Sequence, residues 1–124
     1  MRTPLGMARG LGSAKTGTEH WWLQRVTAIA NIPLVISLIV FILWHLGANR
    51  AALMASVKHP LIAIALAMSF LSILWHMRLG MQVIIEDYVH DEIWKLVILM
   101  LNTFFSFAVG LAAVFAILKL SFGL

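Results

Sequence analysis

Apolar side chains gather into three long blocks along this chain, at roughly residues 26–46, 60–85 and 93–118. Each block is close to the ~20 residues that cross the hydrocarbon core of a bilayer as a helix. The pattern therefore predicts an all-α integral membrane protein, with three transmembrane helices inside residues 26–121. Because the connections between the blocks are short, consecutive helices are expected to be antiparallel neighbours.

Single residues refine this outline. Pro33 lies inside the first block and predicts a kink there, because proline lacks a backbone donor. Gly47 is expected in the left-handed conformation that ends a helix, a loop is expected over 48–59, and Pro60 suits the first position of the second helix. Small and polar residues at four-residue steps in the third block predict a packing seam, formed by Asn102, Ser106 and Gly110.

Composition supports a membrane protein and excludes several kinds of site. Of the 124 residues, 62% are hydrophobic and only 11% are charged, which is far more apolar than a soluble domain of this size. The chain has no cysteine, so it holds no disulfide, no iron–sulfur cluster and no thiolate zinc site. Basic residues flank the blocks singly and form no patch interleaved with aromatics, so lipid is the expected partner and nucleic acid is not.

The distribution of charge predicts the topology. Residues 1–25 are expected to form a cytoplasmic arm, because they contain four basic residues and one acid, namely Arg2, Arg9, Lys15, Arg25 and Glu19. Within this arm, residues 6–18 are rich in Gly, Ser and Thr and are expected to be extended. No signal peptide is expected, since the arm contains no apolar core. The first loop and the C-terminus then face outward, and the second loop faces the cytoplasm.

The second block carries the strongest candidate for chemistry. On a helix, Gly80 lies about 40° and Asp87 about 20° from His76, whereas Arg78 lies about 200° away on the other side. A histidine with a glycine one turn away suits an axial ligand of a haem, because the missing side chain leaves room for the porphyrin. The alternative is that His76 bonds to a backbone carbonyl of another helix. Arg78 either extends to the interface or meets a carboxylate of another chain.

A second axial ligand is not available within the chain. His45 is expected at the outer end of the first helix, whereas His20, His59 and His90 lie at or beyond helix ends. His76 is thus the one histidine near the middle of the membrane. If His76 binds a haem, a second histidine would come from a partner subunit, and the three helices would be part of a larger, multi-subunit helical bundle.

Polar residues at the cytoplasmic surface form a second candidate site. Asp87 and Tyr88 lie about 17 Å along the axis from His76 if the helix continues, on the same side as His20 and Arg25. A tyrosine hydroxyl donates to a quinone carbonyl, and a neighbouring carboxylate orients it or relays protons. The alternatives are a tyrosine of the interfacial belt and an aspartate that caps the third helix. Arg25 pairs with an anion such as a haem propionate, or only sets topology.

Two motifs carry a resemblance to a known family. Arg25-Val26-Thr27-Ala28 is similar to an Arg-x-Thr-Ala pattern, and His76-x-x-x-Gly80 followed by Asp87-Tyr88-Val89 is similar to a His-x-x-x-Gly…Asp-Tyr-Val signature. The chain resembles the hydrophobic membrane-anchor subunits of succinate dehydrogenase, respiratory complex II. The three-span layout extends the likeness over most of the chain, although the third helix supplies no diagnostic residue.

The resemblance implies roles for the candidate residues. His76 would be an axial ligand of haem b, opposite a histidine of a companion three-helix anchor subunit. Tyr88, with Asp87 beside it, would line the ubiquinone site next to the iron–sulfur subunit, and Arg25 would lie near the haem propionates. Some members have a histidine five or six residues before that arginine. Glu19 takes the position six before, which leaves His20 as the candidate for this role.

The function implied is that of the membrane anchor of a succinate:ubiquinone oxidoreductase in a bacterial inner membrane, with a periplasmic C-terminus. The chain would then be a subunit of an enzyme whose succinate-oxidising site belongs to the flavoprotein subunit. Two alternatives remain at this point. One is the anchor of a fumarate reductase, and the other is a small transporter or assembly subunit in which His76 and Arg78 line a polar path.

Overall fold

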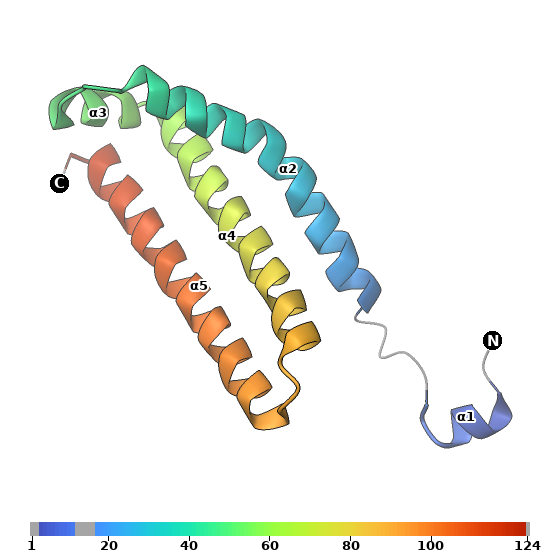
Figure 1. Ribbon diagram of the computed structural model, residues 1–124. Coiled ribbons are helices and arrows are strands. Elements are labelled where there is room, and N and C mark those ends of the chain that lie inside the picture. The colour runs from blue at the N-terminus through green and yellow to red at the C-terminus, as the bar shows by residue number, and fades with distance from the viewer. Residues whose placement is uncertain (1–2, 12–16, 124) are drawn as a thin grey trace.

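The computed structural model describes residues 3–11 and 17–123, which form helices, turns and short links. Figure 1 shows five helices in the described part of the chain: α1 (Pro4–Ala8), α2 (Gly17–Trp44), α3 (Arg50–Val57), α4 (Pro60–Tyr88) and α5 (Glu92–Ser121). Among the described residues, α2, α4 and α5 are long and apolar enough to cross a membrane. The predicted all-α fold with three spans is therefore confirmed.

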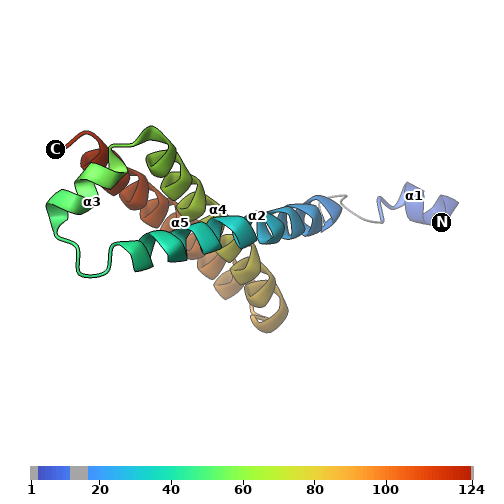
Figure 2. The ribbon, with the colours of Figure 1, turned by 90° about the horizontal axis from the view of Figure 1, so that it is seen from above.

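The long helices are arranged around α4. Helix α4 contacts both α2 and α5, whereas α2 and α5 do not contact each other within the described part of the chain. Figure 1 shows α4 between α2 and α5. In Figures 1 and 2, α3 lies at the end of the group where α2 ends. Helix α3 packs on α4 and α5. The result is an open group of helices rather than a closed bundle.

Hydrogen bonds of polar side chains join α2 to α4. The hydroxyl of Ser72 donates to Asn31 Oδ1 at 2.6 Å. The hydroxyl of Ser69, which is buried, lies 2.7 Å from the carbonyl oxygen of Ala65 and 3.3 Å from that of Leu34. Small polar residues let membrane helices approach closely and bond across the interface.

The contact between α4 and α5 uses the seam expected from the sequence. Ser106 and Gly110 are buried, and Asn102 Nδ2 donates to the carbonyl oxygen of Arg78 at 3.2 Å. A Cβ added to Gly110 would be in van der Waals contact with Leu74 Cδ1 at 3.6 Å, so this position has room for no side chain much larger than that of alanine. The predicted seam on α5 is confirmed.

The helix ends differ from the sequence-based outline in two places. Helix α2 begins at Gly17 rather than near residue 26, with the acid Glu19 in its first turn, where the helix dipole favours a negative charge. The loop expected over 48–59 was wrong for its middle part, because Asn49 caps α3 by accepting from the backbone N–H of Ala52 at 2.9 Å. The short helix α1 lies within the arm expected to be extended. Residues 12–16 of that arm lie outside the described residues.

Other predicted boundaries are confirmed. Gly47 has φ of 75°, as expected for the residue that follows a helix, and Pro60 opens α4 directly after the cap His59. Pro33 lies inside α2, which continues past it and curves along its length (Figure 1). Helix α5 is capped by Asp91, whose carboxylate accepts from the backbone N–H groups of its first turn. The cap role considered for Asp87 was therefore wrong.

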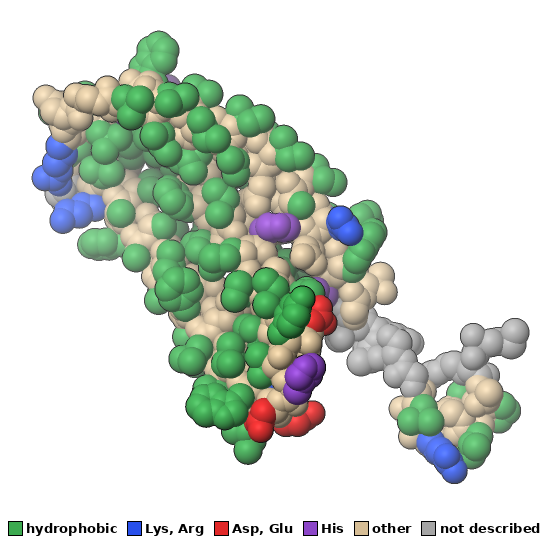
Figure 3. Space-filling model, viewed as in Figure 1, with side chains coloured by type: hydrophobic (Ala, Val, Ile, Leu, Met, Phe, Trp, Pro, Cys, Tyr) green, Lys and Arg blue, Asp and Glu red, His purple; other side chains and the backbone are tan. Residues whose placement is uncertain are grey.

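Few side chains are buried within this chain. The buried hydrophobic residues are Val57, Leu66, Leu79, Ile85 and Ile117, and α2 contains no buried residue. Figure 3 shows hydrophobic side chains over most of the visible face of the long helices. Such a surface is stable against lipid tails or against another apolar subunit, not against water. This is a multi-pass membrane protein.

Candidate functional site

His76 is held by α2. It is half-buried on α4, and its Nδ1 lies 3.0 Å from Thr27 Oγ1. Among the described residues, none forms a hydrogen bond with Nε2 of His76. The alternative for His76 was a bond to a backbone carbonyl of another helix. The partner is instead the hydroxyl of Thr27, and the other ring nitrogen of His76 remains open for a ligand.

Gly80 lies one turn from His76, and the space beside it is open. A Cβ added to Gly80 would meet no heavy atom within 4 Å, in contrast to Gly110. Glycine inside a helix costs about 1 kcal/mol relative to alanine. No described contact within the chain requires this glycine, and the space beside it is accessible to a group from outside the chain.

These two residues fit one half of a haem site. Nε2 of His76 is open, as a haem ligand requires, and the open space at Gly80 would leave room for a macrocycle. Within the described part of the chain, no three His, Asp or Glu side chains come together as a ligand set for a bare metal ion. A metal held at His76 therefore needs further ligands from a macrocycle and from another subunit.

His20 faces a separate cavity of about 370 Å³ between the start of α2 and α4. His20 and Thr27 lie within about 20° of each other on α2, on the side that contacts α4. Nε2 of His20 and Nε of Arg78 are buried without a hydrogen-bond partner among the described residues. At the same cavity, Gln82 Nε2 donates to Glu86 Oε1 at 3.0 Å.

Arg25 lies on a different side of α2. It is about 160° from Thr27 by helical geometry, and its side chain is exposed. Its guanidinium carbon lies 5.4 Å from the centre of the Trp21 ring, which is within range of a cation–π contact. Arg25 is therefore directed away from α4 and is accessible to a neighbouring subunit.

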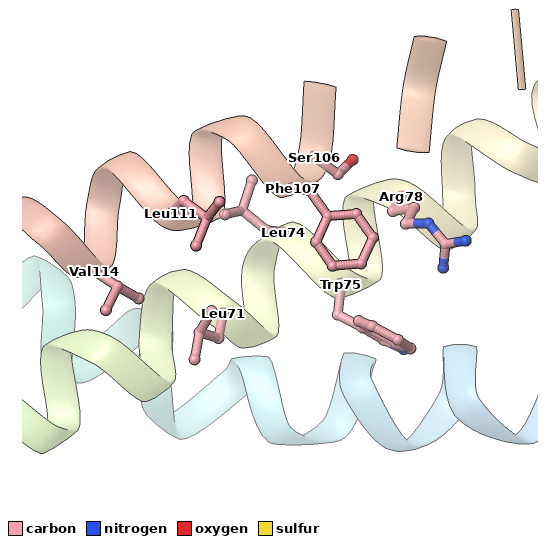
Figure 4. Close-up of a pocket in the computed structure, with 9 residues that line it drawn as sticks. Leu71, Leu74, Trp75, Arg78, Ser106, Phe107, Leu111 and Val114 are labelled. Atoms are coloured by element: carbon pink, nitrogen blue, oxygen red, sulfur yellow. The ribbon is translucent and has the colours of Figure 1, made fainter. Parts of the chain in front are cut away.

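Arg78 lines an apolar groove between α4 and α5 as well as the cavity beside His20. Figure 4 shows Arg78 beside Trp75 and Phe107 at one end of this groove of about 290 Å³. The guanidinium carbon lies 5.5 Å from the centre of the Trp75 ring. Because Arg78 lines both, it reaches the space between α2 and α4 as well as the groove beside α5.

Asp87 and Tyr88 are the last two residues of α4, which runs unbroken from His76 to this point. Both are exposed, and 77% of the Tyr88 surface is accessible. Among the described residues, neither side chain has a hydrogen-bond partner. The two polar groups are therefore free for a ligand or another subunit, about 17 Å along the axis from His76.

Comparison with known proteins decides the family. The family model described as "Succinate dehydrogenase/Fumarate reductase transmembrane subunit" matches residues 1–117. The chain belongs to this family. No solved structure matches this transmembrane subunit.

Curated relatives of this transmembrane subunit have closely similar names. The "Succinate dehydrogenase hydrophobic membrane anchor subunit" of Rickettsia bellii is 38% identical over 88 residues, which are 71% of this chain and 70% of the relative. The protein of the same name from Paracoccus denitrificans is 31% identical over 121 residues, 98% of this chain and 93% of the relative. The "Succinate dehydrogenase membrane anchor subunit" of Reclinomonas americana is 34% identical over 86 residues, 67% of this chain and 72% of the relative.

One contact of His76 could not be read directly from the sequence motifs. Thr27 was noted only as part of the Arg-x-Thr-Ala pattern, yet it is the residue that contacts His76. The available signal was helical spacing. Thr27 shares a side of α2 with His20 and Asn31, at steps of seven and four residues, and that side faces α4.

Proposed function

We propose that this chain is the membrane-anchor subunit of a succinate dehydrogenase, that it supplies half of a haem b site, and that it forms part of a ubiquinone site. The observation that carries the proposal is the pairing of an open imidazole nitrogen at His76 with open space at Gly80 in a member of this family. The family description covers fumarate reductases too. The printed names of the curated relatives favour succinate dehydrogenase.

The haem half-site consists of residues on α4 and α2. Nε2 of His76 would be one axial ligand, a histidine of a companion three-helix anchor subunit would be the other, and Gly80 would leave room for the porphyrin. When bound, haem b supplies a centre that accepts and releases one electron. Arg25 is exposed toward a neighbour, and His20 has a buried nitrogen without a described partner, which suits groups near the propionates.

The quinone half-site lies at the end of α4. Tyr88 would donate its hydroxyl proton in a hydrogen bond to a ubiquinone carbonyl oxygen, and the Asp87 carboxylate would orient the hydroxyl or relay protons. Both side chains are exposed, which leaves them accessible to the iron–sulfur subunit. That subunit would dock on the cytoplasmic side and deliver the electrons.

The chain contributes attachment and part of two sites, while other subunits perform the oxidation of succinate. It has no cysteine and so cannot ligate an iron–sulfur relay. A flavoprotein subunit would oxidise succinate, and an iron–sulfur subunit would conduct the electrons. The chain would span a bacterial inner membrane with its N-terminus in the cytoplasm and its C-terminus in the periplasm.

Purification of the tagged chain from bacterial membranes tests this function. We expect a flavoprotein, an iron–sulfur protein and a second three-span subunit to purify with it. In that complex, Tyr88→Phe is expected to lower quinone reduction about tenfold or more, because a hydrogen bond of about 1.4 kcal/mol corresponds to a factor of ten. Succinate oxidation by a soluble artificial dye should be unchanged.

The control is His90→Ala, which alters an exposed side chain two residues from Tyr88 and should leave both activities unchanged. Recovery of the chain without a flavoprotein would reject the anchor function. Equal loss of quinone and dye activity in Tyr88→Phe would reject its quinone role, because that pattern indicates failed assembly.

A further inference from the structure

Thr27 contacts His76 at the nitrogen opposite the one left open. We propose that Thr27 is a positioning residue that fixes the tautomer and ring orientation of His76. In this arrangement Thr27 Oγ1 accepts a hydrogen bond from Nδ1–H, which leaves Nε2 unprotonated for the iron. The inference deepens the proposed function, since it rests on haem ligation by His76.

The direction of the bond follows from the single proton of the threonine hydroxyl. Thr27 Oγ1 lies 2.8 Å from the carbonyl oxygen of Leu23 and 3.0 Å from that of Gln24. Carbonyl oxygens only accept, so the hydroxyl proton is directed to them. The contact of 3.0 Å between Oγ1 and Nδ1 of His76 must then use the proton of the imidazole.

The tautomer has a direct chemical consequence. A neutral imidazole carries one proton, so a proton on Nδ1 leaves the lone pair on Nε2 available. No described residue forms a hydrogen bond with Nε2 of His76. A hydrogen-bond acceptor on the far nitrogen also makes a ligating histidine a stronger donor and fixes its ring orientation. Unlike a carboxylate, the Thr27 hydroxyl does this without placing a charge inside the membrane.

The hydroxyl is held in place by α2 itself. Threonine has few side-chain rotamers in a helix, and its bond to the carbonyl one turn before selects between them. Four residues further along α2, the bond between Asn31 and Ser72 at 2.6 Å fixes the register of α2 against α4. The partner of His76 is therefore preorganised by contacts that do not involve the haem.

The test uses the complete purified complex with Thr27→Val, which keeps the shape and removes the hydroxyl, and Thr27→Ser, which keeps the hydroxyl. The matched control is Thr103→Val, because Thr103 on α5 makes the same kind of bond to its own helix, at 3.0 Å to the carbonyl oxygen of Leu99, and no other with a described residue. The readouts are the midpoint potential of haem b and the electron paramagnetic resonance g values of the oxidised haem.

We expect Thr27→Val to raise the midpoint potential and shift the g values, because a weaker imidazole donor destabilises the ferric haem more than the ferrous haem. A tenfold change in the ratio of the two oxidation states at a fixed potential equals 59 mV for a one-electron couple. Thr27→Ser and Thr103→Val should match the wild type. A Thr27→Val complex that lacks haem, beside a Thr27→Ser complex with wild-type g values, would also support the role of the hydroxyl.

Wild-type potential and g values in Thr27→Val would overturn the inference. So would equal haem loss in Thr27→Val and Thr27→Ser, since that result points to packing rather than to the hydroxyl. His76→Ala separates the two proposals. If His76→Ala keeps a normal haem signal, the haem ligation itself fails. If it loses haem while Thr27→Val is unchanged, only the role of Thr27 fails.

Discussion

Polar residues within the helices divide into those satisfied inside this chain and those left open. Ser69, Ser72 and Asn31 all form hydrogen bonds between α2 and α4. By contrast, His20 Nε2 and Arg78 Nε are buried without a described partner. An unsatisfied polar group costs several kcal/mol in a bilayer core. The open groups therefore mark where haem, water, lipid or another subunit completes the structure.

Gly80 provides a test at the residue scale. Gly80→Leu should lower the haem content of the purified complex severalfold, because its side chain would fill the space beside His76. It should not destabilise the chain, since a Cβ there meets nothing within 4 Å and leucine favours helix by about 1 kcal/mol. Haem per protein and the unfolding temperature are the measurements.

The matched variant is Gly110→Leu. Its Cβ would already be in van der Waals contact with Leu74 Cδ1 at 3.6 Å, so the leucine atoms beyond Cβ should force α4 and α5 apart and lower the unfolding temperature. Full haem content in Gly80→Leu would contradict the placement of the macrocycle beside Gly80.

Residue-scale prediction from sequence succeeded where the relevant neighbours lie on one helix. The angular positions of Gly80 and Arg78 relative to His76 follow from helical geometry alone. Thr27 is 49 residues from His76, so identifying their contact requires the register between α2 and α4. Roles for Tyr88 and Asp87 stay predictions that the experiments above test.

At the scale of elements, the three spans could be predicted because their apolar blocks are longer than those of soluble proteins. The ends of the spans were less well defined. Helix α3 was missed because it has only eight residues, and a short connection of this length between two spans is equally compatible with a loop. Helix α2 extends to Gly17 through Trp21 and Trp22, residues whose interfacial preference is compatible with either a helix or an arm. Local caps and tertiary packing settle such ends.

The joint between α2 and α4 can be tested by a double-mutant cycle on Asn31 and Ser72. Asn31→Ala, Ser72→Ala and the double variant should give a coupling of about 0.6 kcal/mol, the average for hydrogen bonds between membrane helices. Unfolding of the purified complex in mixed micelles of increasing sodium dodecyl sulfate measures it. Ser37→Ala is the control, because Ser37 donates to the carbonyl of Pro33 on its own helix at 2.8 Å. A coupling of zero would show that the bond does not hold the helices together.

At the scale of the whole molecule, the chain is an incomplete assembly. Helix α4 has neighbours on two sides, but α2 contains no buried residue. A protein whose apolar helix faces point outward is suited to join a second helical subunit. The sequence predicted this incompleteness from the single histidine near mid-membrane. It could not predict how the helices are arranged, because apolar residues surround each helix almost evenly.

The orientation in the membrane can be tested directly, because the natural chain has no cysteine and gives no labelling background. Basic residues before α2 predict a cytoplasmic N-terminus. A maleimide that cannot cross the membrane should therefore label Ala48→Cys, between α2 and α3, in intact spheroplasts. It should label His90→Cys, between α4 and α5, only after the membrane is opened. The reverse pattern would invert the topology and move Tyr88 to the periplasmic side.

The central claim is that His76 holds a haem b together with a partner subunit, and one spectrum tests it most directly. The measurement is the reduced-minus-oxidised absorption spectrum of the purified complex carrying His76→Ala, beside His90→Ala, an exposed histidine, as control. The account predicts that the b-type signal is lost or strongly altered in His76→Ala and is unchanged in His90→Ala. A normal b-type signal in His76→Ala would contradict it.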